Sequence, residues 1–303
     1  MRLITFKPKR SGAPRLGVVL EGEQVLDIGK AAKRARRRLP FDAADMVSLI
    51  ASGKTGLAMV RKLVKGFKGK SVALPAVRLM APIPRPRKNV LCVGWNYLDH
   101  FQEGAKARPQ TVEMPSHPAF FSKAPTTVNG PYDPIPAHVG LTERLDWEVE
   151  LGVVIGKGGR NIAEADAMKH VFGYTVINDV SAREVQRQHG GQWFKGKSLD
   201  GSCPMGPWIA TADEVPHPDN LRVTCRLNGV AKQDSNTTHM YFKIPRLIAE
   251  FSAGMTLEPG DIISTGTPAG VGHARTPPEF MKAGDILETE IVGLGLLRNK
   301  IGG

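Results

Sequence analysis

At residues 145–151 the chain reads Leu-Asp-Trp-Glu-Val-Glu-Leu, and at residues 176–179 it reads Val-Ile-Asn-Asp. Hydrophobic residues flank both stretches, so each is expected to lie in the interior, where an unpaired carboxylate is costly. Side chains alternate between the two faces of a strand. One face would therefore hold the apolar residues Leu145, Trp147, Val149, Leu151, Val153 and Ile155, and the other the acidic residues Asp146, Glu148 and Glu150. We expect the apolar face to pack in the core. The acidic face would present Glu148 and Glu150 for chemistry, and Asp179 of the second stretch would join them.

The three carboxylates of Glu148, Glu150 and Asp179 predict a bound cation. Carboxylates packed this closely repel one another, and burial disfavours their charged forms unless protons or a metal ion neutralise them. A ligand set made only of oxygen atoms favours a hard ion. We therefore expect Mg²⁺, with Mn²⁺ and Ca²⁺ as alternatives.

The composition is that of an ordinary globular protein. The 303 residues are 41% hydrophobic and 23% charged, and no run of about 18 apolar residues could span a bilayer. The N-terminus lacks the long apolar core of a secretory signal. Cys92, Cys203 and Cys225 form no Cys-x-x-Cys pair, which argues against a disulfide framework and a zinc site. We expect a cytoplasmic protein without a membrane segment.

The net charge of +12 is concentrated near the N-terminus. Residues 1–88 hold 21 basic and 5 acidic residues, whereas residues 89–303 hold 20 and 24. No aromatic residue interleaves the densest basic cluster, residues 33–38, as a nucleic-acid stacking platform would require. A solvated helix face or a docking patch is therefore favoured. A noncatalytic protein that binds nucleic acid or an acidic partner is the alternative from another class.

Proline marks a boundary between two expected domains. Residues 1–78 read as a small basic α/β domain, with a hairpin formed by 16–20 and 24–28 and helices within 29–66. The proline-rich stretch 81–88 forbids a regular helix and makes a stiff connection.

The second expected domain covers residues 79–303. Short strands, abundant glycine and proline, and few long helices favour a β-rich α+β domain over alternating βαβ units. The clearest helix, 183–188, follows Asp179 and opens with a capping box from Ser181 to Glu184. The other expected elements are a hairpin at Asn228-Gly229, a helix at 244–251, and strands at 89–93, 261–264 and 286–291.

Two further groups suit chemistry beside the carboxylates. His100 and Glu103 are three residues apart, so on a helix the carboxylate can orient the imidazole as a general base; an exposed surface pair is the alternative. Within residues 192–197, Lys197 is expected in a pocket and Lys195 in solvent. The Lys197 ammonium could stabilise a developing oxyanion or enolate, with ordinary surface charge as the alternative.

Two loops complete the candidate site. Residues 264–270, Ser-Thr-Gly-Thr-Pro-Ala-Gly, offer N–H groups and hydroxyls that could hold a substrate carboxylate, or they form a plain glycine turn. Residues 101–117 are polar, contain two prolines, and are the best candidate for a lid.

Six segments in register resemble the fumarylacetoacetate hydrolase family: Val93-Gly-Trp-Asn-Tyr97 with His100 and Glu103, Pro118-Ala-Phe-Phe-Ser-Lys123, Glu148-Val-Glu150, Phe172-Gly-Tyr-Thr-Val-Ile-Asn-Asp179 with Ser181-Ala-Arg183, Lys197-Ser198, and Gly266-Thr-Pro-Ala-Gly270. The resemblance implies a mixed β-roll catalytic domain, usually a homodimer, that binds Mg²⁺ or Mn²⁺. By position it implies the metal ligands Glu148, Glu150 and Asp179, the water-activating dyad His100 and Glu103, the site lysine Lys197, and the substrate contacts Gln186 and Thr267.

One position differs from the animal enzyme that gives the family its name. That enzyme has a further metal-binding aspartate seven residues before its histidine, and Val93 stands there in this chain. The difference counts against fumarylacetoacetate as the substrate. The chain resembles more closely a bacterial branch with three carboxylates, which includes acylpyruvate hydrolases, oxaloacetate decarboxylases and isomerases of homoprotocatechuate breakdown.

The expected reaction is metal-dependent cleavage of a carbon–carbon bond in a small 2,4-dioxo acid, acylpyruvate or fumarylpyruvate-like, in aromatic or organic-acid catabolism. His100, assisted by Glu103, would activate water to attack the distal carbonyl, and Lys197 would stabilise the departing pyruvate enolate. Decarboxylation of oxaloacetate and keto–enol or 2-hydroxymuconate-type isomerisation are alternatives at the same site. In each case the partner is a small anionic oxo acid.

Overall fold

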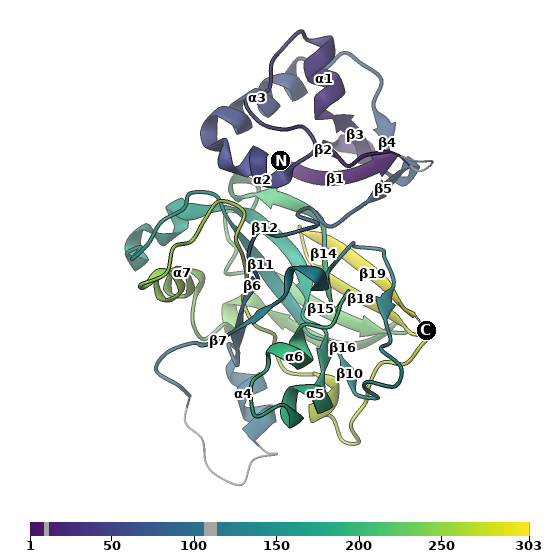
Figure 1. Ribbon diagram of the computed structural model, residues 1–303, viewed down its shortest axis with the longest axis vertical. Helices are drawn as coiled ribbons and strands as arrows, with labels where there is room; N and C mark the ends of the chain where they lie inside the picture. The colour runs from purple at the N-terminus through teal and green to yellow at the C-terminus, as the bar shows by residue number, and fades with distance from the viewer. Residues whose placement is uncertain (9–11, 106–113, 303) are drawn as a thin grey trace.

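The computed structural model describes residues 1–8, 12–105 and 114–302. Strands dominate it, and the helices lie around the sheets rather than alternating with the strands (Figure 1). The expected α+β class is confirmed. Within the described residues, no helix combines the length and the apolar character needed to cross a membrane.

The N-terminal part lies at one end of the molecule, where helices pack over the first strands of the chain (Figure 1). Its elements are β1 (Arg2–Pro8), β2 (Arg15–Leu20), β3 (Gln24–Asp27), α1 (Ile28–Arg34), α2 (Met46–Ala51), α3 (Gly53–Lys65), β4 (Val72–Ala73) and β5 (Val77–Leu79). The predicted hairpin is confirmed, because β2 pairs antiparallel with β3. Its second strand is one residue shorter than expected, since the Asp27 side chain accepts a hydrogen bond from Lys30 N at 2.9 Å and starts α1 at Ile28.

A large sheet continues from this part into the rest of the molecule. Its further strands are β6 (Val90–Gly94), β7 (Ala119–Lys123), β8 (Val128–Asn129), β11 (Val149–Ile155), β12 (Val171–Asn178), β14 (Cys203–Thr211) and β17 (Ile262–Ser264). β1 pairs antiparallel with β14, with Leu3 opposite Ile209, and the sheet then runs through β12, β11, β17 and β6 to β7. The N-terminal part therefore shares a sheet with the following residues, and the division into 1–78 and 79–303 stays a prediction.

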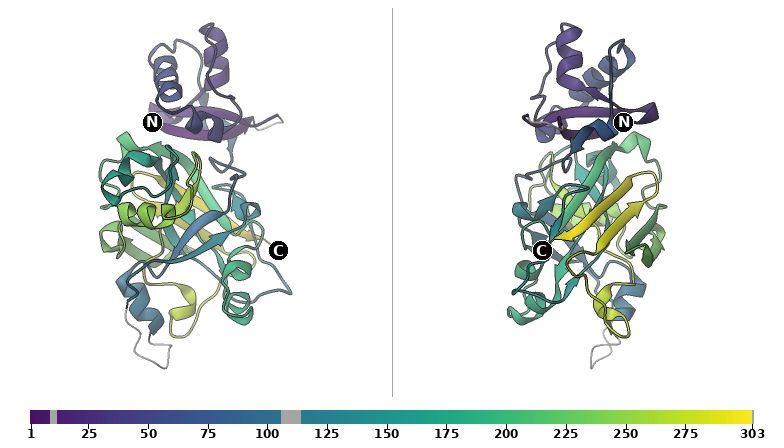
Figure 2. Two further views of the ribbon diagram at one scale, coloured as in Figure 1. Left: turned by 60° about the vertical axis from the view of Figure 1, so that its left-hand side comes forward. Right: turned by 90° about the vertical axis from the view of Figure 1, so that its right-hand side faces the viewer.

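A second sheet lies across one face of the large sheet (Figure 2). Its strands are β9 (Ile135–Pro136), β15 (Arg222–Leu227), β16 (Val230–Asn236), β18 (Ile286–Ile291) and β19 (Gly295–Gly302). The predicted hairpin at Asn228-Gly229 is confirmed between β15 and β16. Alternate residues of β11, from Val149 to Ile155, pack in the core between the sheets, as the pattern predicted.

Short elements around the sheets carry several of the candidate side chains named from the sequence. They are α4 (Leu98–Ala105), β10 (Leu145–Asp146), β13 (Ser181–Ala182), α5 (Arg183–Gln188), α6 (Phe194–Lys197) and α7 (Ile244–Ser252). The helix after Asp179 is confirmed, but its capping box is wrong. Ser181 lies in β13, and its hydroxyl donates to the Asp179 carbonyl, while Glu184 accepts from the backbone N–H of Glu143. The antiparallel pairing of β13 with β10 draws Ser181 away from the helix end.

Candidate metal centre and catalytic pocket

The large sheet brings Glu148, Glu150 and Asp179 together. Val149 of β11 lies opposite Asn178 of β12, and the Asp179 N–H donates to the Glu148 carbonyl at 2.9 Å. One carboxylate oxygen from each residue lies within 4.8 Å of the others. All three side chains are buried. The run at 145–151 is not one continuous strand, because β10 ends at Asp146 and β11 begins at Val149, yet both glutamates reach the same place.

Hydrogen-bond donors of the protein bind each of these carboxylates. Glu148 accepts from Arg183 at 2.6 Å on one oxygen and from Lys197 at 2.7 Å on the other. Glu150 accepts from the Ser264 hydroxyl and from the Gly266 N–H at 2.9 Å. These bonds fix the directions in which the carboxylates point.

Asp179 shares Lys197 with Glu148 and retains one oxygen without a hydrogen bond. The Lys197 ammonium donates to Asp179 Oδ2 at 2.7 Å. Asp179 Oδ1 forms an ion pair with Lys123 Nζ at 2.8 Å but accepts no hydrogen bond. A metal ion would give this buried oxygen a further partner beside the two other carboxylates.

The charges within the cluster pull its pKa values apart. Burial, joined by the charges of Asp179 and Glu148, raises the pKa of Glu150 well above its ordinary value. Burial would also raise the pKa of Glu148, but the charges of Lys197 and Arg183 outweigh it and lower that pKa. Glu148 is thus stabilised as an anion by two neighbouring cations, and Glu150 is not. A metal ion would supply the missing positive charge beside Glu150.

The chemistry of these residues fits a hard divalent cation. The donor set is three buried carboxylates, one of them with an oxygen that accepts no hydrogen bond, and Mg²⁺ or Mn²⁺ prefers such oxygen ligands. Glu148, Glu150 and Asp179 would hold the ion. Their roles as ligands stay a proposal.

A cavity of about 380 Å³ opens beside the carboxylates. Its wall contains most of the side chains that the sequence pointed to: His100, Glu148, Glu150, Gln186, Lys197 and Thr267. His100 comes from α4, with Nδ1 3.4 Å from Glu103 Oε2. Glu103 also accepts the Gly270 N–H with both oxygens at 3.1 Å, so the dyad is fixed to the glycine-rich loop. Of the predicted lid, residues 106–113 lie outside the described residues.

The expected contrast between the two lysines is confirmed: Lys197 is buried and Lys195 is exposed. A close approach of α6 to α5 carries Lys197 inward. A Cβ atom at Gly196 would lie 2.4 Å from the backbone nitrogen of Gln186, so glycine is needed at this crossing. Gln186 Oε1 in turn accepts from Arg183 at 3.2 Å.

Two N–H groups of the loop at 264–270 are not available for a substrate carboxylate, contrary to expectation. The N–H groups of Gly266 and Gly270 bind the protein's own carboxylates, Glu150 and Glu103, instead of a substrate. Thr267 still lines the cavity, and its hydroxyl oxygen accepts from Gln233 at 2.8 Å, which leaves the hydroxyl hydrogen available.

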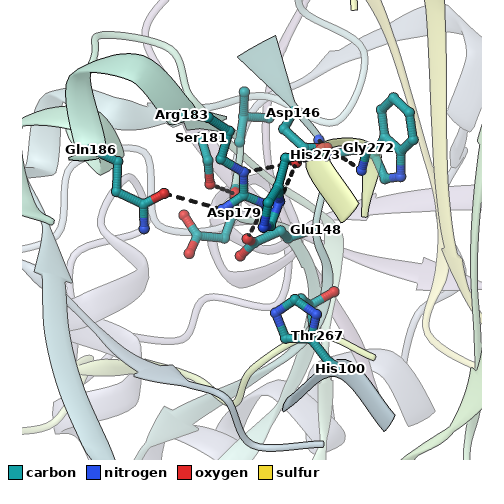
Figure 3. Close-up of polar contacts among 12 residues, drawn as sticks. His100, Asp146, Glu148, Asp179, Ser181, Arg183, Gln186, Thr267, Gly272 and His273 are labelled. Atoms are coloured by element: carbon teal, nitrogen blue, oxygen red, sulfur yellow. Dashed lines mark hydrogen bonds and ion pairs between the residues drawn. The ribbon is translucent and has the colours of Figure 1, made fainter. Parts of the chain in front are cut away.

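The structure adds Asp146, Arg183 and His273, for which the sequence suggested no role (Figure 3). Arg183 bridges Asp146 at 2.7 Å and Glu148 at 2.6 Å. Asp146 lies in the same acidic stretch as Glu148 and Glu150, so its position in the sequence could have identified it as a site residue. Asp146 and His273 are 127 residues apart in the sequence, and no local pattern predicts their contact.

Comparison with known proteins identifies the family. The family model "Fumarylacetoacetate (FAA) hydrolase C-terminal" matches residues 89–302. The chain is 42% identical to oxaloacetate tautomerase YisK of Bacillus subtilis, over 95% of this chain and 96% of that protein. It is also 42% identical to the mitochondrial oxaloacetate tautomerase Fahd2a of Rattus norvegicus, over 99% and 91%.

One relative has a solved structure with a metal ion and a 2-oxo acid bound. Maleylpyruvate hydrolase from Sphingobium sp. SYK-6, in complex with manganese(II) and pyruvate, shares 31% sequence identity with this chain. The match covers 100% of this chain and 99% of that one, with a TM-score of 0.78.

Proposed function

Because this chain belongs to the fumarylacetoacetate hydrolase family and is one of its enzymes, we propose that it interconverts the enol and keto forms of oxaloacetate with a divalent metal ion. One observation carries the proposal: His100, which is paired with Glu103, borders the same cavity as Glu148, Glu150 and Lys197. The two tautomerase relatives match nearly the whole chain. Keto–enol exchange therefore takes precedence over the carbon–carbon cleavage expected from sequence.

The reaction moves one proton at C3 while negative charge develops on the C2 oxygen. A bound Mg²⁺ or Mn²⁺ ion would supply positive charge beside that oxygen. His100, oriented by Glu103, takes or returns the C3 proton. Lys197 has a third ammonium hydrogen beyond the two used by Glu148 and Asp179, so it can donate toward the developing charge. Gln186 and Thr267 hold the acid in place.

Hydrolysis of a 2,4-dioxo acid is the second candidate. The solved maleylpyruvate hydrolase supports it, since that protein aligns along the whole chain and its structure contains pyruvate. Both reactions pass through a 2-oxo acid enolate, so the residues around the cavity suit either one. Hydrolysis additionally needs a water molecule beside His100 and a second carbonyl in the substrate.

Product analysis separates these functions. Oxaloacetate, acylpyruvates and 2-hydroxymuconate-type acids are incubated with the metal-loaded enzyme, and tautomers, pyruvate and carbon dioxide are measured. We expect the enol–keto conversion of oxaloacetate to be faster than the reaction of any of the other acids. Release of pyruvate from acylpyruvates, without tautomerisation of oxaloacetate, would establish the hydrolase instead.

The base can be tested by His100→Gln, with His217→Gln as the control because His217 is exposed and its side chain has no contact with the cavity. Loss of a general base lowers turnover by about a hundredfold to ten-thousandfold. Metal affinity should not change, since His100 is not among the proposed ligands. Wild-type turnover in His100→Gln would remove the dyad from the mechanism.

A further inference from the structure

His273 borders the cavity and forms a second imidazole–carboxylate pair with the buried Asp146 (Figure 3). His273 lies on the turn at Gly272–Ala274. Asp146 accepts the backbone N–H of Gly272 at 2.6 Å and of His273 at 3.0 Å. A Cβ atom at Gly272 would lie 2.0 Å from the Glu279 carbonyl oxygen, so glycine allows the turn to approach this closely. The backbone that carries His273 is therefore fixed.

The same carboxylate sets the tautomer of the His273 ring. His273 Nδ1 lies 3.1 Å from Asp146 Oδ2, an oxygen that also accepts from Arg183 at 2.7 Å. Because a carboxylate in this setting only accepts hydrogen bonds, Nδ1 carries the ring hydrogen and Nε2 presents a lone pair. No described residue bonds Nε2, and the His273 side chain is 17% exposed at the cavity wall. A partly buried and oriented base thus lines the cavity where the substrate would lie.

We propose that His273 is a second catalytic base, which exchanges the proton of the substrate's enol hydroxyl while His100 exchanges the proton at C3. The inference rests on the proposed tautomerase function. Keto–enol conversion breaks one bond to hydrogen and makes another on a different atom, and two bases on one cavity can serve the two atoms. Figure 3 shows the two rings on either side of Glu148 in that view.

In the direction from enol to keto, the enol O–H proton passes to His273 Nε2. The electron pair of that bond forms the C=O bond, and the C=C pair takes a proton from protonated His100 to form the new C3–H bond. His273 then loses its proton to water and His100 regains one. The net change is isomerisation, with no atom or electron gained or lost.

Two readouts on oxaloacetate separate this role from a structural one. Ketonisation of the enol needs both bases, whereas exchange of C3 hydrogen for deuterium from D₂O, starting from the keto form, needs only His100. For His273→Gln we expect ketonisation to fall by about a hundredfold, while C3 exchange followed by NMR stays close to the wild-type rate. His100→Gln should lose both activities, and His217→Gln should lose neither.

The outcomes distinguish this inference from the proposed function. If the wild-type enzyme catalyses neither reaction of oxaloacetate, the proposed function fails. If the wild-type enzyme catalyses both, and His273→Gln lowers both equally or neither, the assignment of His273 is overturned. Should His273→Gln fail to fold, His273→Ala with added imidazole replaces it, and recovery of ketonisation by imidazole is the supporting result. No recovery in a folded and metal-binding His273→Ala enzyme contradicts the assignment.

Discussion

Lys197 neutralises two carboxylates of the proposed metal centre at once, Glu148 and Asp179, and all three side chains are buried. Burial would lower the pKa of Lys197, but the charges of Asp179 and Glu148 outweigh it and raise that pKa. The ammonium therefore stays charged at neutral pH. Its removal leaves Glu148 paired only with Arg183 and Asp179 paired only with Lys123, so the buried cluster holds more negative than positive charge, which is strongly unfavourable in a protein interior.

Lys197→Met should accordingly destabilise the metal-free protein by about 3–5 kcal/mol, the usual effect of breaking a buried ion pair. A divalent ion would replace part of the lost positive charge. We expect Mn²⁺ to raise the melting temperature of Lys197→Met by more than it raises that of the wild type. Lys195→Met is the matched control, because Lys195 is exposed and should change little. Equal stability of both variants under chelation would contradict this role for Lys197.

At the scale of elements, the contact between α5 and α6 positions Lys197 and Gln186 together. Gly196→Ala would place a methyl group 2.4 Å from the Gln186 backbone nitrogen, and such overpacking costs about 1–3 kcal/mol. We expect lower turnover and lower stability, measured by steady-state kinetics and urea unfolding. Gly302→Ala is the control, since a Cβ atom there meets its nearest neighbours at 3.7 Å. Unchanged kinetics in Gly196→Ala would show that α5 can shift to accept the methyl group without displacing Lys197 or Gln186.

Local patterns predicted several elements and four of the side chains that line the cavity, His100, Glu148, Glu150 and Lys197, and the family resemblance added Gln186 and Thr267. The alternation around Glu148 and Glu150 follows from strand geometry, and β18 has the expected bounds of 286–291. The capping box failed because Ser181 pairs across to β10, a contact that lies outside the local pattern. Likewise, the link from Asp146 through Arg183 to Glu148 depends on which strands become neighbours, and residue spacing does not specify that.

At the scale of the whole molecule, the N-terminal part shares a hydrophobic core with the large sheet. Leu3 and Leu16 pack in one buried cluster with Phe172 and Ile209, and β1 extends the sheet at β14. This shared core favours packing over a nucleic-acid role for the basic N-terminal part. A cytoplasmic location and a homodimer stay predictions.

Deletion of residues 1–78 should therefore expose the edge of β14 and an apolar face. We expect the truncated chain to aggregate or to melt well below the full chain, as measured by light scattering and circular dichroism. A soluble 79–303 fragment with full turnover and an unchanged melting temperature would show that the N-terminal part is dispensable.

The central claim is that Glu148, Glu150 and Asp179 hold a divalent ion beside His100 for enol–keto conversion of oxaloacetate. The most direct measurement is the rate of this conversion by chelator-treated enzyme before and after addition of Mn²⁺ or Mg²⁺, in the wild type and in Glu150→Gln. We predict that the ion restores activity to the wild type and leaves Glu150→Gln inactive. Full activity under chelation, or equal restoration in both proteins, would contradict the claim.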